Sequence, residues 1–283
     1  MVRYNLGRAL ATVASIVICL GRPRPAFDRG IADSWYKFAY TSFSFGFLFS
    51  WFGYSAARSP EKKSLALVLL LVNFVAGATY FLQQCRLTLI FKNVVGHPVD
   101  IARYLEWFSC CPVLISIISE VTKTPHHLDT TMTHDYIMLT FGLIGSLMRE
   151  PYSYLSTTMS VSTFTVCLIG LWNMYTEAIE GKSGSTLDNN SLKTARFFTI
   201  LCWCCFPIIW HLQKTFIVSF GTGEALFVLT DFGAKLVLTM ILINASVEQS
   251  QNEKVDAIAT LATQMEAEMS NTEQLLEKMM PAG

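Results

Sequence analysis

An apolar run of the chain, from Glu224 to Ile243, contains an aspartate and a lysine and is long enough to cross a bilayer. Asp231 and Lys235 lie four residues apart within it. At helical spacing the two side chains share one face, where each can neutralise the other or a third group. An ionisable residue at bilayer depth costs at least about 2.5 kcal/mol, so it faces a bundle interior and marks a function. The run therefore predicts a functional site inside a helical membrane protein.

A buried lysine of this kind has two uses. Burial favours the neutral amine, which is nucleophilic toward a carbonyl group and can form a Schiff base. The other use is an ion pair in a transporter or channel. The run around Lys235 leaves both open, so the rest of the chain has to decide between them.

Composition places the whole chain in a membrane. Of its 283 residues, 52% are hydrophobic and only 15% are charged, with a formal net charge of zero. This balance indicates a polytopic membrane protein with lipid around it, and the absence of a basic block argues against a nucleic-acid partner. The eight cysteines lie mostly in apolar runs without a second Cys/His pair at zinc-finger spacing. We expect them to serve packing or pocket lining rather than disulfides or metal binding.

Hydropathy predicts an all-α fold, a seven-transmembrane-helix bundle with an extra N-terminal helix and a C-terminal cytoplasmic coiled-coil helix. Residues 1–30 form the N-terminal segment, 31–243 the bundle and 244–283 the C-terminal linker and signalling helix. The run 6–20 has three interpretations, namely a short extra span, an interfacial helix or a signal peptide, and we favour the first because no small-residue cleavage site follows it. The seven predicted spans are 35–57, 64–84, 99–121, 136–148, 161–179, 197–213 and 221–243.

Basic residues set the predicted orientation. Arg58, Lys62 and Lys63 follow the first of the seven spans, which places that connection in the cytoplasm. Alternation then places the loops 123–135 and 176–196 and the C-terminus on the same side. An extra span at 6–20 would leave the N-terminus cytoplasmic as well.

The C-terminal segment carries a heptad pattern. Apolar residues step by three and four without a break on one face, and acidic residues dominate the other faces. An amphipathic tail on the bundle or the membrane is one interpretation, but an acidic helix suits an anionic inner leaflet poorly. We favour a parallel coiled coil with a second chain, as a homodimer or a heterodimer with a related protein. The seam consists of Val255, Ile258, Ala262, Met265, Met269, Thr272, Leu276 and Met279.

A second buried carboxylate lies in the third of the seven spans. Arg103, Glu106 and Cys110 step by three and four, so they line one helix face, with Trp107 and Cys111 beside it. A protonated Schiff base would carry a positive charge that needs counterions. Glu106 and the aspartate of the last span would supply two, and Arg103 would balance the surplus negative charge. The alternative is that Glu106 only partners Arg103.

The sixth span carries an aromatic face. Trp203, Phe206 and Trp210 step by three and four, and Pro207 weakens the backbone ladder at that point. Such a stripe is usually core packing. Together with Trp107 and a buried lysine, it predicts a slot for a long, flat, apolar carbonyl compound.

These patterns together resemble the microbial (type I) rhodopsins. The resemblance covers about residues 35–243 and rests on Arg103-Tyr104-x-Glu106-Trp107, Pro112, Trp203-x-x-Phe206-Pro207-x-x-Trp210 and Asp231-x-x-x-Lys235. It implies that Lys235 binds all-trans retinal as a protonated Schiff base, with Glu106 and Asp231 as counterions and Glu106 as proton acceptor. Arg103 and Tyr104 would support them. The implied retinal pocket consists of Trp107, Cys110, Cys111, Pro112, Trp203, Phe206, Pro207 and Trp210.

Several residues differ from the pattern of the family, and these differences indicate which class of microbial rhodopsin to expect. Proton pumps usually have a carboxylate where Ile117 stands, so we do not expect an efficient pump. Channelrhodopsins share Glu106 and Cys111, but many of them pair this cysteine with an aspartate from the fourth span, where our alignment places Thr140. Phe206 stands where many relatives have a tyrosine, so one hydrogen bond to the counterion of the last span should be missing.

The helical extension beyond the last span is similar to that of the fungal rhodopsin guanylyl cyclases. This resemblance implies a photoreceptor domain, not itself an enzyme, that relays light through a coiled coil to a cyclase domain of the full-length protein and so controls cGMP synthesis. Two alternatives remain, a light-gated ion channel and the sensor of a rhodopsin phosphodiesterase.

Overall fold

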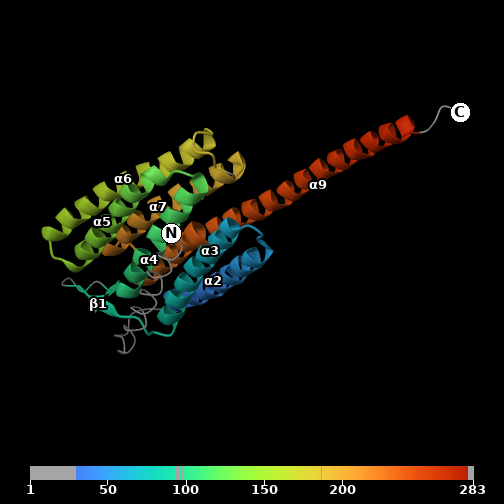
Figure 1. The fold of residues 1–283 in the computed structure, drawn as a ribbon. Coiled ribbons are helices and arrows are strands. Elements are labelled where there is room, and N and C mark those ends of the chain that lie inside the picture. Colours follow the sequence, from blue (N-terminus) through green and yellow to red (C-terminus); the bar gives the residue numbers. More distant parts are fainter. Residues whose placement is uncertain (1–29, 94–95, 97, 186, 280–283) are drawn as a thin grey trace.

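The computed structural model describes residues 30–279 apart from 94–95, 97 and 186, and leaves out the side chains of 247–254, 257 and 270–279. Its helices form a closed ring, because each contacts the next and α8 returns to α2, while α9 projects far out of the bundle (Figure 1). The predicted N-terminal helix at 6–20 lies outside the described residues. The helices are α2 (Gly30–Ala56), α3 (Pro60–Gln84), α4 (Ile101–Thr122), α5 (Leu128–Leu147), α6 (Tyr152–Ile179), α7 (Asn189–Lys214), α8 (Phe220–Asp231) and α9 (Leu238–Met279).

Local sequence signals determine where several of these helices begin. Ser59, Asp100, Asp188 and Ser219 stand immediately before α3, α4, α7 and α8. In each case the side-chain oxygen accepts a hydrogen bond from a backbone N–H of the first turn. Such caps satisfy N–H groups that have no partner inside the helix.

The structure corrects the predicted start of the fourth span. α5 begins at Leu128, two turns before the predicted Tyr136, so most of the predicted loop 123–135 is helical. The polar residues of this stretch lowered its hydropathy, but neighbouring helices bury Thr131 and Asp135. The same reason applies to α6, which begins at Tyr152 rather than at residue 161.

Two small elements complete the described fold and were not predicted. Strands β1 (Ile90–Lys92) and β2 (Pro98–Asp100) pair antiparallel between α3 and α4, so the described chain is not purely α-helical. A 3₁₀ turn, η1 (Pro125–His127), connects α4 to α5. Both lie at ends of the bundle and leave its helical interior unchanged.

Five stretches in the described part of the chain are long and apolar enough to cross a membrane: residues 60–84, 101–122, 152–179, 189–214 and 220–246. α2 and α5 do not meet this criterion. The outer surface of α2 is nevertheless apolar, since Leu48, Trp51 and Phe52 are more than half exposed. An exterior of this kind is suited to lipid rather than water.

The chain changes helical geometry at the predicted functional lysine. Between α8 and α9 lies one π-helical turn, η2 (Phe232–Val237), which contains Lys235. Such turns often mark functional sites. Gly233 allows close packing here, because a Cβ at that position would lie 2.6 Å from the Cys202 Sγ of α7. The turn that carries Lys235 is therefore held directly against α7.

Candidate functional site

The Lys235 side chain lies in the centre of the bundle between two carboxylates. It is 1% exposed, and its Nζ lies 2.6 Å from Glu106 Oε1. Nζ also forms an ion pair and a hydrogen bond with Asp231 Oδ1. The hypothesis that Glu106 only partners Arg103 is therefore wrong, because Glu106 pairs with the lysine.

Arg103 pairs instead with a carboxylate that the sequence analysis did not assign. Its Nη2 bonds to Glu224 Oε2, and its Nη1 lies 3.9 Å from Asp231 Oδ2. Glu224 also accepts hydrogen bonds from the Tyr36 hydroxyl at 2.6 Å and from Gln213 Nε2 at 3.3 Å. The signal for Glu224 was present in the sequence, since it precedes Asp231 by two helical turns on the same face.

Tyr80 of α3 donates a hydrogen bond to Asp231 Oδ2 that the sequence analysis did not predict. Phe206 of α7 has no hydroxyl, so no hydrogen bond to Asp231 comes from that position, as expected. The Tyr80 hydroxyl also lies 3.5 Å from Arg103 Nη1. The structure thus shows one connected buried network that runs from Lys235 through Asp231 to Arg103.

Five residues of this network carry formal charge. Lys235 and Arg103 are basic, while Glu106, Asp231 and Glu224 are acidic. With all five ionised, the network has one net negative charge. The three carboxylates therefore compensate the positive charges of Lys235 and Arg103 inside the bundle.

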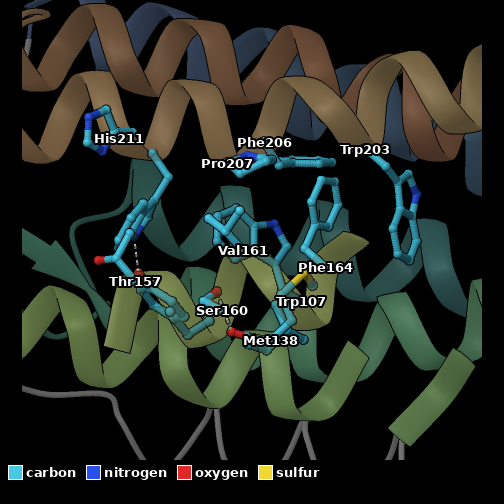
Figure 2. A pocket seen from close by; sticks show the side chains of 14 residues that line it. Trp107, Met138, Thr157, Ser160, Val161, Phe164, Trp203, Phe206, Pro207 and His211 are labelled. Carbon is cyan, nitrogen blue, oxygen red and sulfur yellow. Dashed lines mark hydrogen bonds between the residues drawn. The ribbon is translucent and has the colours of Figure 1, made fainter. Parts of the chain in front are cut away.

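An aromatic-walled cavity of about 140 Å³ lies next to this network, between α4, α5, α6 and α7 (Figure 2). Trp107, Trp203, Phe206, Pro207 and Trp210 of the predicted pocket line it. Cys110, Cys111 and Pro112 of the predicted pocket do not. The sequence analysis assigned none of the lining residues from α5 and α6, because their helices carry no aromatic stripe. The other lining residues are Tyr104, Met138, Leu139, Gly142, Thr157, Ser160, Val161, Phe164 and His211.

Phe206 connects the cavity to the lysine. Its ring lines the cavity, and its centroid lies 5.9 Å from Lys235 Nζ. Trp107 packs edge-on against the same ring, with centroids 5.4 Å apart. The apolar cavity and the buried primary amine thus both lie next to the Phe206 ring.

Tyr104 supports the cavity wall rather than the carboxylates. Its hydroxyl shares a 2.6 Å hydrogen bond with Ser146 Oγ and accepts a 2.8 Å hydrogen bond from Trp210 Nε1. These contacts join α4, α5 and α7 and fix the orientation of the Trp210 ring.

Two cysteines lie beside carboxylates. One of these carboxylates, Asp135, was not assigned by the sequence analysis. Cys110 lies near Glu106, and Cys111 lies near Asp135 of α5. Asp135 is fully buried, and neither of its carboxylate oxygens has a hydrogen-bond partner among the described residues. Thr140, which the alignment placed opposite Cys111, is instead exposed and donates to Tyr136 O.

A ring of apolar helices closed around a buried, carboxylate-paired lysine is typical of a multi-pass membrane protein. The chain belongs to the bacteriorhodopsin-like protein family, whose pattern matches residues 32–249. The resemblance to the type I rhodopsins is confirmed by this match and by the fold.

Relatives include sensory and enzyme-linked rhodopsins. The sensory rhodopsin-2 of Haloarcula vallismortis is 23% identical over 164 residues, which is 57% of this chain and 67% of the relative. The transmembrane domain and linker of the Salpingoeca rosetta rhodopsin phosphodiesterase has a TM-score of 0.81 and 23% identity, and the match covers 95% of this chain and 89% of the other. The light-driven proton pump of Coccomyxa subellipsoidea has a TM-score of 0.68 and 22% identity, covering 76% and 97%. At 22–23% identity, the similarity to these two structures establishes a common fold.

Proposed function

We propose that this chain is the light-sensing domain of an enzyme rhodopsin, which binds all-trans retinal on Lys235 and signals through α9 to a cytoplasmic guanylyl cyclase domain. The observation that carries the proposal is the buried Lys235 amine, held between Glu106 and Asp231 beside an aromatic-walled cavity. A plain structural ion pair needs one carboxylate and no cavity.

The residues present fit retinal. Lys235 would hold it covalently, and Trp107, Phe206 and the other lining residues would enclose its apolar chain. Bound retinal supplies absorption of visible light and a change of shape on absorption. In this proposal the helix-breaking Pro207 lets α7 yield locally to such a change.

Glu106 is the residue that we expect to receive a proton. Its Oε1 lies 2.6 Å from Lys235 Nζ, so it is within reach of a proton carried by that nitrogen. Asp231, by contrast, also accepts a hydrogen bond from Tyr80 and lies 3.9 Å from Arg103 Nη1, so groups other than Lys235 compensate its negative charge. Protonation of Glu106 removes its negative charge and so weakens the ion pair between Glu106 of α4 and Lys235 of η2. In this proposal η2 and α7 can then shift.

α9 is the element that would carry the signal out of the bundle. It continues from the Lys235 turn as one helix to Met279 (Figure 1). Val255, Ile258, Met265 and Met269 of the predicted seam are each more than 60% exposed. A row of exposed apolar residues on an isolated helix supports pairing with a second chain, as a homodimer or a heterodimer with a related rhodopsin.

The proposed topology has seven membrane crossings within the described residues, with α2 and α5 added to the five apolar stretches. Arg58, Lys62 and Lys63, at the connection of α2 to α3, support a cytoplasmic location for that end of the bundle. α9 leaves the bundle from the same end (Figure 1), which supports a cytoplasmic location for the C-terminus.

The test is an absorption spectrum of the purified chain produced with all-trans retinal. We expect a visible band that bleaches with hydroxylamine under illumination, and complete loss of this band in Lys235→Ala. Lys63→Ala, an exposed position in the first turn of α3, is the control and should keep it. A visible band that survives in Lys235→Ala would refute the assignment.

A phosphodiesterase is the second candidate for the enzyme. It is favoured by the likeness to the Salpingoeca rosetta rhodopsin phosphodiesterase, which extends over the linker region and so over α9. Cells that carry the full-length protein distinguish the two: light should raise cGMP with a cyclase and lower it with a phosphodiesterase. Photocurrent without any change in cGMP would favour a light-gated channel instead.

A further inference from the structure

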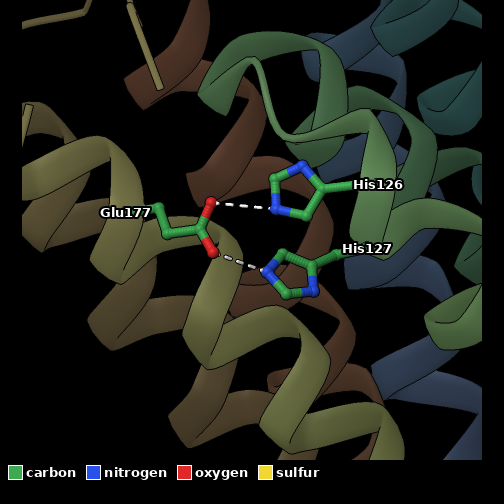
Figure 3. Close-up of side chains that lie close together, drawn as sticks. All are labelled: His126, His127 and Glu177. Carbon is green, nitrogen blue, oxygen red and sulfur yellow. Dashed lines mark hydrogen bonds and ion pairs between the residues drawn. The ribbon is translucent and has the colours of Figure 1, made fainter. Parts of the chain in front are cut away.

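Two neighbouring histidines and a glutamate meet at one end of the bundle, away from the lysine cluster (Figure 3). His126 and His127 belong to η1, and Glu177 lies near the end of α6. His126 Nε2 lies 3.0 Å from Glu177 Oε2, and His127 Nε2 lies 2.8 Å from Oε1. The carboxylate thus bridges two imidazoles that point at it from the same side.

We propose that His126, His127 and Glu177 form a binding site for a divalent transition metal ion, of which Zn²⁺ is the probe. Imidazole nitrogen and carboxylate oxygen are ligands that Zn²⁺ takes at about 2.0–2.1 Å in tetrahedral geometry. That geometry places two ligand atoms about 3.3 Å apart. Each imidazole nitrogen lies about this far from one of the two carboxylate oxygens, at 3.0 and 2.8 Å, and one ligand atom from each residue lies within 4.8 Å of the others. Small rotations of the side chains suffice to admit the ion.

The cluster is open enough for an ion to enter. The side chain of His126 is 60% exposed, that of Glu177 30% and that of His127 24%. Water can therefore supply the fourth ligand, as in zinc sites that keep an open position. Lys182 lies nearby in the chain, but Glu180 holds its amine at 2.6 Å, so the charge of Glu177 remains available for a cation.

The site lies at the end of the bundle from which α9 leaves, so a bound ion would affect how the helices are held together there. The α4–α5 connection, the end of α6 and the exit of α9 lie at the same end of the bundle (Figure 1). Ser185 of the α6–α7 connection already donates to Val121 O of α4 at 2.8 Å. A bound ion would add a second link at this end, joining η1 to α6. The sequence analysis missed the site because its ligands come from segments 50 residues apart.

The experiment is a Zn²⁺ titration of the purified full chain, stripped with a chelator and followed by calorimetry. Every protein carries Cys85→Ser, because Cys85 is an exposed thiol that would compete for the ion. We expect one Zn²⁺ per chain and at least tenfold weaker binding in His126→Ala, His127→Ala and Glu177→Gln. His134→Ala is the matched control, since His134 is exposed and contacts its own helix, and it should bind like the parent.

Circular dichroism establishes that each variant is folded, and zinc X-ray absorption of the parent should show two imidazole ligands. Failure of the parent to bind Zn²⁺ would overturn the proposal. So would equal affinity in the parent and the Glu177→Gln and His126→Ala variants. Because none of these residues contacts Lys235, the result is independent of whether the chain binds retinal.

Discussion

Replacing Glu224 with glutamine tests how much the buried network stabilises the bundle. The Arg103 and Glu224 side chains are only 5% and 2% exposed, so glutamine would leave the guanidinium without its close carboxylate. Removal of one partner of a buried ion pair costs about 3–5 kcal/mol. Asp231 remains 3.9 Å from Arg103, and glutamine still accepts from Tyr36, so we expect the lower end of that range.

Asp33→Asn is the matched control, because it makes the same chemical change in an arginine pair at the surface. Arg86 is 62% exposed and Asp33 24%, and pairs of this kind contribute only about 0–1 kcal/mol. The assay is unfolding of the purified chain in mixed micelles by increasing detergent denaturant, followed by circular dichroism. If Glu224→Gln lowers the free energy of unfolding by less than about 1 kcal/mol, or by no more than Asp33→Asn does, the Arg103–Glu224 pair does not stabilise the bundle as argued.

Two further predictions concern packing and assembly. Gly170→Ala should destabilise the chain by about 1–3 kcal/mol relative to Gly142→Ala in the same unfolding assay. A Cβ at position 170 would clash with the Thr131 hydroxyl, whereas a Cβ at position 142 would make only an ordinary contact. Equal free energies of unfolding for the two variants would contradict this. Ile258→Asp should shift the chain from dimer to monomer in light scattering, while Thr260→Asp, off the seam, should leave it dimeric. An unchanged mass for Ile258→Asp would show that the seam does not hold the dimer.

The sequence predicted those features that depend on the spacing within one helix. The four-residue interval of Asp231 and Lys235 and the face shared by Trp203, Phe206 and Trp210 follow from 3.6 residues per turn alone. The contacts of Lys235 with Glu106 and of Phe206 with the cavity agree with these faces. The roles of these residues toward retinal stay predictions until the spectrum is measured.

The tertiary structure decided every pairing that joins distant helices. Tyr80 and Asp231 are 151 positions apart, and Arg103 and Glu224 are 121 apart, so no local pattern relates them. Asp135 was hidden because polar neighbours lowered the hydropathy of its helix, although packing buries it. The spacing of residues determines which face of a helix carries the polar or aromatic side chains of the site. The rotation and register of one helix against another follow from the packing of the whole ring. That packing placed Glu224 against Arg103 and Asp135 beside Cys111, and it joined Glu177 to the two histidines.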